Sequence, residues 1–288
     1  MAAAEPVELR AGRFALPLTR PLIMGVVNIT PDSFSDGGRF LDPARAVEQL
    51  QRLVEEGADL LDIGGESSRP GAAPVALEQE RRRVMPVLER VVGLGVPVSV
   101  DTSKPELMRE AVAAGAAMIN DINGLRAPGA LEAAVAGDAA VCVMHMQGEP
   151  GTMQRAPAYG DVVSEVREFL LARAQALLGL GVARGRIVLD PGFGFGKTAQ
   201  HSLELLRRLP ALVDCGFPVL AGLSRKSVLG RITGRPVDSR LCASVAAAML
   251  AAQRGASILR VHDVAATRDA LLVQRAVQDE AYTLIEHD

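Results

Sequence analysis

The sequence predicts an α/β fold in which eight parallel strands, each followed by a helix, close into a (β/α)8 or TIM barrel. Short apolar runs alternate with longer helical segments eight times along the chain. Most of these runs are apolar throughout, which is typical of strands covered on both faces. Their spacing fits strand-then-helix units, and no linker or change of composition divides the 288 residues. We therefore expect a single domain over residues 1–288, with a doubly wound open sheet as the less favoured alternative.

Each predicted element is delimited by turn and capping residues. Residues 1–20 form an N-terminal extension in which 7–20 predict a short hairpin that bends at Ala11-Gly12. The first helix has Asp42 as its N-cap, Pro43 in its first turn and Gly57 at its end. The strands are expected at 22–27, 59–63, 97–100, 117–119, 139–144, 186–189, 217–223 and 257–259. The later helices are expected at 76–92, 104–115, 129–136, 161–180, from Ser202 onward, at 240–254 and toward 278.

Composition excludes several classes of protein. Thirty-one basic residues against 34 acidic ones give a net charge of −3, and no basic block suggests a nucleic-acid partner. Three cysteines, widely spaced and odd in number, argue against a disulfide framework and predict a reducing, cytoplasmic location. The N-terminus lacks the pattern of a secretory signal, and no apolar run reaches the roughly 18–20 residues of a membrane span.

Polar side chains gather at the predicted strand ends, where the active sites of (β/α)8 barrels lie. A single Asp before a helix is more often a cap than a catalytic group, but at Asp101 the following Thr102 or Ser103 can cap instead. Capping also does not require a mixture of acids, amides and cations, so the set predicts a binding site at one rim. Its members are Asn28, Ser68, Arg69, Asp101, Asn120, His145, Asp190, Lys226, Arg260 and His262.

Two familiar site types do not fit the spacing. The run GFGFGKT at 192–198 lacks the glycine position that a P-loop needs, and its glycines are better suited to let a flat ligand approach the backbone near Asp190. The four histidines are scattered and do not form a zinc motif. A hard cation held by Asn28, loop oxygens and ligand phosphates stays possible.

The remaining candidates are read mainly as structural. Lys226 could be a Schiff-base lysine, although its polar neighbours favour contact with an anion. Cys142, Met24 and Met118 are expected in the core. Met144 lies close enough to the rim to contact a ligand.

Eight motifs in order over about residues 20–270 resemble the dihydropteroate synthases of folate biosynthesis. They are MGVVNITPDSFSDGG, DIGGESSRPGA, VDTSKPE, INDINGL, MHMQGEPGTMQ, LDPGFGFGKT, AGLSRKS and ILRVHDV. The resemblance implies a barrel that is usually a homodimer and that binds Mg²⁺. It also implies a transferase that joins 6-hydroxymethyl-7,8-dihydropterin diphosphate to 4-aminobenzoate, giving 7,8-dihydropteroate and pyrophosphate. Sulfonamides mimic the second substrate.

The resemblance also implies roles for individual residues. Asn28 matches the Mg²⁺ ligand. The pterin diphosphate site is implied to contain Ser68, Met144, Asp101, Asn120, Asp190, Lys226, Arg260 and His262, of which the last two contact the pyrophosphate. Two mobile loops and the carboxylate contact of 4-aminobenzoate are implied at Phe34, Asp36, Ser68, Arg69, Pro70, Phe195 and Ser227. Catalysis is assigned to Asp36, Lys226, Arg260 and His262. Ser68 stands where threonine is common, so a methyl group is lost and small effects on ligand fit are expected.

The chemistry of these residue types agrees with that reaction. An ionised Asp190 can accept from two adjacent N–H groups of a pterin, and Asn120 can both donate and accept. We expect a dissociative displacement in which Asp36 opposes a cationic pterin methylene, beneath lids at 29–39 and 64–74. Three alternatives stay open: a pterin-binding methyltransferase, a non-catalytic pterin-binding paralogue and a Schiff-base aldolase.

Overall fold

The computed structural model describes residues 8–30, 42–67, 72–149, 151–279 and 281–282. In this part of the chain the barrel strands are β3 (Leu22–Asn28), β4 (Leu60–Gly64), β5 (Val98–Asp101), β6 (Met118–Asp121), β7 (Ala140–Met144), β8 (Ile187–Asp190), β9 (Leu220–Ala221) and β10 (Ile258–Val261). All pair in parallel, in the order β8-β7-β6-β5-β4-β3-β10-β9. A bridge between Leu189 and Val219 joins the two ends of the sheet. The predicted (β/α)8 barrel is therefore confirmed.

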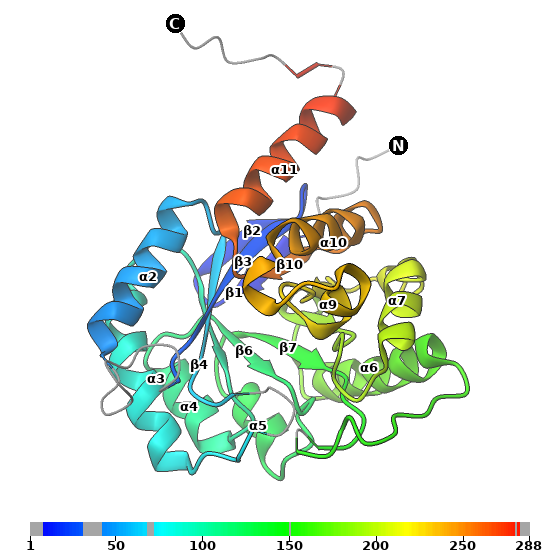
Figure 1. Cartoon of the computed structure of the whole chain (residues 1–288). Coiled ribbons are helices and arrows are strands. Elements are labelled where there is room, and N and C mark those ends of the chain that lie inside the picture. Colours follow the sequence, from blue (N-terminus) through cyan, green and yellow to red (C-terminus); the bar gives the residue numbers. More distant parts are fainter. Residues whose placement is uncertain (1–7, 31–41, 68–71, 150, 280, 283–288) are drawn as a thin grey trace, which may run out of the picture.

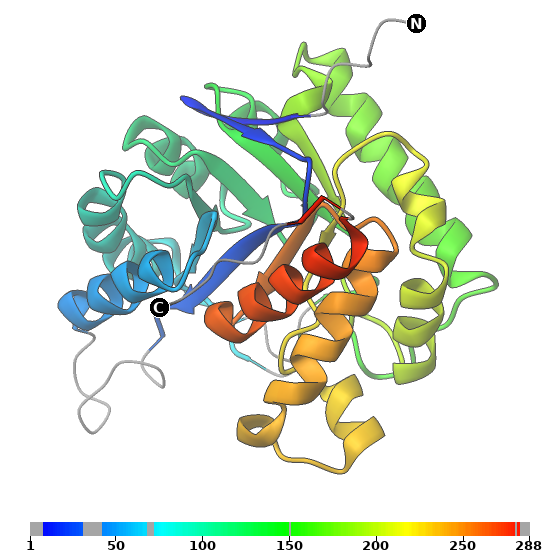
Figure 2. The ribbon, with the colours of Figure 1, turned by 90° about the horizontal axis from the view of Figure 1, so that it is seen from above.

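The helices surround the strands, as Figure 1 and Figure 2 show in two views that are 90° apart. They are α2 (Pro43–Glu55), α3 (Leu77–Val91), α4 (Pro105–Ala113), α5 (Ala130–Ala134), α6 (Val162–Gly179), α7 (Ala199–Arg207), α8 (Pro210–Val213), α9 (Ser227–Thr233), α10 (Leu241–Gln253) and α11 (Val264–Gln278). Within the described ranges, none is long and apolar enough to cross a bilayer. The predicted start of the first helix is confirmed, because the Asp42 carboxylate accepts from the N–H of Ala44.

Two element predictions were wrong in detail, and the short helix α9 was missed. Helix α7 begins at Ala199 rather than Ser202, because Thr198 and His201 form a capping box one turn earlier. Strand β9 is only two residues long, since Pro218 has no N–H to donate and Val219 contributes an isolated bridge. The short helix α9, which begins directly after Lys226, was not predicted.

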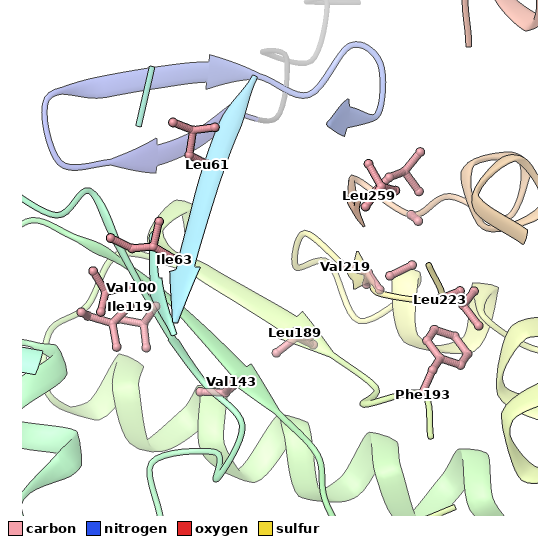
Figure 3. Close-up of a cluster of buried hydrophobic side chains, with 14 of the residues drawn as sticks. Leu61, Ile63, Val100, Ile119, Val143, Leu189, Phe193, Val219, Leu223 and Leu259 are labelled. Carbon is pink, nitrogen blue, oxygen red and sulfur yellow. The ribbon is translucent and has the colours of Figure 1, made fainter. Parts of the chain in front are cut away.

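Side chains of the barrel strands alternate between two apolar layers. Outward-facing residues such as Leu61, Ile63 and Val143 pack with apolar residues of the helices in one large cluster (Figure 3). Inward-facing residues such as Leu60 belong to a second cluster that contains no helix residue. The alternation places this second cluster inside the barrel.

The N-terminal hairpin seals the lower end of the barrel. Strands β1 (Glu8–Ala11) and β2 (Phe14–Pro17) pair antiparallel across a turn at Gly12, which confirms the predicted hairpin. Leu9 and Ala11 are fully buried in the inner apolar cluster. The same cluster contains Met24, Met118 and Cys142, as predicted for these core residues. The interior is therefore apolar at the end where the strands begin, and only the opposite end is left for polar chemistry.

Candidate active site

The inward-facing positions become polar toward the carboxyl ends of the strands. Neighbouring strands in register bring Asp101 opposite Asn120 and Asp62 opposite Ser99. In the same ladder Asn28 lies opposite Gly64, which itself lies opposite Asp101. Asn120 is buried, as are Asp62 and Ser99. The predicted residues Asn28, Asp101 and Asn120 thus lie together at the carboxyl ends of the strands. We call the polar inner surface at this end of the barrel the cup.

An arginine bridges two carboxylates across this cup. Arg260 donates from Nε to Asp62 Oδ2 at 2.7 Å and from Nη2 to Asp101 Oδ2 at 3.2 Å. The Asp62 side chain is fully buried, so its charge needs this partner. Burial and the charge of Asp62 raise the pKa of Asp101, and Arg260 opposes that rise. The guanidinium is therefore fixed inside the barrel by two acids.

Asp190 and Lys226 form the second charged part of the cup. Asp190 is 6% exposed, and its Oδ1 accepts from the N–H of Gly192 at 2.7 Å. Burial raises the pKa of Asp190, while Lys226 and Arg260 work in the opposite direction. Burial lowers the pKa of Lys226 to about 8. The Lys226 ammonium donates to the carbonyl of Phe193 and lies 4.7 Å from the centre of the Phe195 ring.

A strained turn holds Lys226 in this position. Arg225, the residue before it, has a φ of +58°, which is uncommon for a residue with a side chain. The Arg225 N–H donates to the hydroxyl of Ser244 on α10 at 2.9 Å, and its guanidinium pairs with Asp263. Backbone strain of this kind persists only where surrounding contacts enforce it. Helix α10 and the start of α11 thus support the placement of Lys226.

His262 lies at the end of β10, on the same rim. Its Nδ1 is 3.0 Å from the hydroxyl of Ser224, which also accepts from the His262 backbone N–H at 3.2 Å. This contact joins the end of β10 to the segment after β9 and fixes the orientation of the imidazole.

Three buried polar atoms in the cup have no hydrogen-bond partner among the described residues. They are Asp62 Oδ1, Ser99 Oγ and Asn120 Oδ1. Buried polar groups are nearly always paired, and an unpaired one costs about 1–3 kcal/mol. Two of the three can only accept, so the cup suits a ligand that offers several N–H donors.

The structure places the other predicted residues as follows. Met144 is buried and packs with the Phe195 ring in a small apolar cluster at the cup. Ser227 is the first residue of α9 and lines a cavity of about 240 Å³ beside Lys197 and Gly194. The predicted loop residues Phe34, Asp36, Ser68, Arg69 and Pro70 lie outside the described residues, as does most of the predicted first lid.

Asn28 fits the role of a single protein ligand to a metal better than that of one member of a site made only of protein ligands. It is half-buried at the carboxyl end of β3, and the described residues contain no group of three or more His, Cys, Asp or Glu able to hold a metal. Mg²⁺ usually keeps several waters and is bound by one or two protein oxygens plus substrate phosphates. An amide oxygen at the rim therefore suits Mg²⁺ that arrives with a diphosphate.

Sequence reasoning missed Asp62, which had been read only as part of a strand. The available signal was periodicity, because Asp62 shares the inward face of β4 with Leu60 and is a charged residue in an otherwise apolar run. It also missed Lys197, whose contact with the predicted rim residue His145 joins segments 52 residues apart.

Comparison with known proteins decides the family. The model of the pterin binding enzyme family matches residues 24–262. A dihydropteroate synthase of Haemophilus influenzae is 49% identical over 94% of this chain and 98% of its own length. The chain belongs to the dihydropteroate synthase family.

Solved structures agree with this assignment. A dihydropteroate synthase of Xanthomonas albilineans with 4-aminobenzoic acid superposes with a TM-score of 0.89, at 55% identity over 95% of this chain and 98% of that one. One from Burkholderia cenocepacia, complexed with 7,8-dihydropteroate, has a TM-score of 0.87 at 53% identity over 95% and 97% of the two chains.

Proposed function

We propose that this chain condenses 6-hydroxymethyl-7,8-dihydropterin diphosphate with 4-aminobenzoate, releasing 7,8-dihydropteroate and pyrophosphate. The observation that carries the proposal is the polar cup, which lies above the inner apolar cluster. In the cup, Asp190, Asn120 and Asp62 offer buried acceptors beside Lys226 and Arg260. The dihydropteroate synthase relatives, with their arylamine and product complexes, support the same reaction.

The cup can read the edge of a pterin. The amino group and a ring N–H of a pterin are adjacent donors, and a carboxylate can accept both through its two oxygens. Asp190 supplies that carboxylate, and Asn120 supplies an amide oxygen without a partner in the described residues. Lys226 would donate to a ring acceptor. Each mismatched ligand atom would leave a buried polar group unpaired, at about 1–3 kcal/mol.

Arg260, His262 and Asn28, at the ends of the neighbouring strands β10 and β3, suit the departing diphosphate. Negative charge grows on the leaving oxygen as the C–O bond breaks, and fixed cations placed at that oxygen stabilise the transition state. We assign the cationic role to Arg260 and a hydrogen-bonding role to His262, with Asn28 as the protein ligand of Mg²⁺. When bound, Mg²⁺ would neutralise part of the diphosphate charge.

The bond changes need no strong base. The methylene C–O bond breaks with its electron pair going to pyrophosphate, the arylamine nitrogen forms the new C–N bond, and its extra proton passes to water. We propose that C–O cleavage comes first and that the charge of Asp36 opposes the positive charge of the pterin methylene. A carbon isotope effect at the methylene that indicates a tight, associative displacement would contradict this order.

The direct test is pyrophosphate release from the purified chain. Mixing pterin diphosphate, 4-aminobenzoate and Mg²⁺ should release one pyrophosphate for each dihydropteroate formed, and adding EDTA should abolish the release. Omitting 4-aminobenzoate separates condensation from simple hydrolysis. If the chain binds the pterin diphosphate but forms no product, it is a non-catalytic pterin-binding paralogue.

The pH dependence should follow Lys226. Its pKa is lowered to about 8, so it is charged below that pH and loses its donated proton as the pH rises through it. We expect kcat/KM for pterin diphosphate to fall on the alkaline side with an apparent pKa near 8. The Lys226→Met variant should be slower and should lack that limb. An alkaline limb that persists unchanged in the variant would assign the titration to another group.

Sulfonamides, homodimer formation and a cytoplasmic location belong to the same proposal. Sulfonamides carry the arylamine shape of 4-aminobenzoate and are expected to compete for the site beside Ser227. Helices α10 and α11 lie side by side (Figure 2), and each exposes apolar side chains, including Leu250 and Val273. These exposed apolar residues support the expected homodimer, with α10 and the adjoining α11 as its candidate face. The location rests on the widely spaced cysteines.

A further inference from the structure

A buried lysine outside the cup joins two loops of the rim. Lys197 is 2% exposed, and its ammonium lies within hydrogen-bond distance of three acceptors. These are His145 Nδ1 at 2.8 Å, the His145 carbonyl at 3.1 Å and the Phe195 carbonyl at 3.0 Å. Burial lowers the pKa of Lys197 well below its usual value, and a buried amino group is costly unless it is hydrogen-bonded, as it is here by these three contacts. The three contacts therefore hold the segment after β8 to the segment after β7.

His145 is suited to be the acceptor. It follows β7 directly, and its backbone N–H donates to the carbonyl of Asp190 at 3.0 Å. The imidazole packs edge-on against Phe169 of α6, with ring centres 5.0 Å apart. Burial lowers the pKa of His145 to about 3, so the ring is neutral and Nδ1 can accept from Lys197.

The two loops also touch through their backbones. A β-carbon on Gly192 would collide with the carbonyl oxygen of His145, and one on Gly196 with that of Gln147. Both glycines have positive φ, +65° and +57°. The segment after β8 is thus laid directly on the segment after β7, and Lys197 bonds across this contact.

The Lys197 contact continues to the reacting groups. The Phe195 carbonyl that it binds belongs to the residue whose ring lies 4.7 Å from Lys226 Nζ. Two residues earlier, the Phe193 carbonyl accepts from the same Lys226 ammonium. Gly194, between these two phenylalanines, lines the cavity that Ser227 and Lys197 share.

We propose that Lys197 is a positioning residue for the condensation. By tying the loop after β7 to the loop after β8, it fixes Phe195 and Lys226 at the junction of the pterin and 4-aminobenzoate sites. The inference rests on the proposed function. Because a displacement of about 1 Å at reacting groups can cost as much as 100-fold in rate, a contact that touches no substrate can still control turnover.

The test compares Lys197→Met with a variant that only weakens the fold. Methionine keeps the length of the side chain but donates no hydrogen bond. We expect KM for 4-aminobenzoate to rise at least about 10-fold and kcat/KM to fall at least about 30-fold. The matched control is Leu205→Ala on α7, whose buried side chain lies in the outer core. It should lower the urea midpoint and leave KM unchanged.

A double variant shows whether Lys197 and His145 act together. His145→Phe removes the Nδ1 acceptor and keeps a ring against Phe169. Each single variant is expected to raise KM for 4-aminobenzoate. If the contact acts as a unit, adding His145→Phe to Lys197→Met should raise this KM by less than about threefold more. If Lys197→Met does not fold, His145→Phe alone carries the test, with KM for 4-aminobenzoate raised about fivefold.

Some outcomes would overturn the inference. They are a folded Lys197→Met enzyme with KM and kcat within threefold of the unaltered chain, or a His145→Phe enzyme with unchanged KM. A loss of activity in Lys197→Met that follows the fraction unfolded, as in Leu205→Ala, would also reduce Lys197 to a stabilising residue. Absence of activity in the unaltered chain would instead contradict the proposed function, so the two failures are distinct.

Discussion

Replacing Asp190 by asparagine is expected to lower the affinity for the pterin diphosphate by roughly 100-fold or more while the barrel stays folded. The amide oxygen of Asn can keep the bond from the Gly192 N–H. Its NH2 group, however, would face a donor of the pterin where the carboxylate oxygen had accepted. Two unpaired buried donors at about 1–3 kcal/mol each account for a loss of this size.

The fold should tolerate Asp190→Asn because burying the charged Asp190 carboxylate lowers the free energy of unfolding. Burial raises the pKa of Asp190, which means that the surroundings disfavour its charge. The measurement is calorimetric titration with the pterin diphosphate, with urea unfolding of the same sample. Asp161→Asn, at the exposed N-cap of α6, is the matched control because asparagine caps helices equally well. Near-normal affinity in Asp190→Asn would remove Asp190 from pterin recognition.

The Arg260→Met variant should lose about 3–5 kcal/mol of unfolding free energy at pH 8, in addition to its activity. Methionine fills much of the same volume, but it leaves the fully buried Asp62 carboxylate and the partly buried Asp101 carboxylate without their cation. Removing one partner of a buried charge pair costs an amount of this order, because the remaining charge is uncompensated.

The loss of unfolding free energy in Arg260→Met should be smaller at acidic pH. Burial and Asp62 already raise the pKa of Asp101, and removal of Arg260 takes away the group that opposes the rise. A carboxyl group whose pKa is raised by folding stabilises the fold below its unfolded pKa, and this contribution disappears as the pH rises through the folded pKa. Protonation at pH 5 would therefore relieve part of the repulsion that is present at pH 8.

Urea unfolding at pH 5 and pH 8 measures this difference directly. Arg208→Met, which removes an exposed pair with Asp161, is the control and should change the unfolding free energy by less than about 1 kcal/mol at either pH. Full stability of Arg260→Met at pH 8, or an equal loss at both pH values, would show that Arg260 does not compensate the charges of Asp62 and Asp101.

The sequence was sufficient for the barrel because local signals and the global fold agree. The Asp42 cap, the apolar strand runs and the polar residues after them each depend on neighbours only a few positions away. The same rules placed Asp101, Asn120 and Asp190 on one rim, since parallel strands all end on the same side.

Contacts across the barrel could not be predicted in this way. The pairing of Arg260 with Asp62 spans 198 residues and depends on strand register, which the sequence pattern does not specify. The contact of Lys197 with His145 depends on how two loops pack, and a lysine after a glycine run is most simply read as exposed. Strand β9 was predicted too long because its apolar residues fit a strand, whereas Pro218 limits its hydrogen bonds.

The hairpin under the barrel decides the route that substrates can take. Leu9 and Ala11 pack against the inner apolar cluster, so the described residues close the lower end of the barrel. Substrates would then enter and leave at the carboxyl ends of the strands. A ligand bound deep in a pocket that is open at one end must bind before a ligand that covers it, and must leave after it. The order of substrate arrival would then be a property of the architecture, fixed by residues that never meet a substrate.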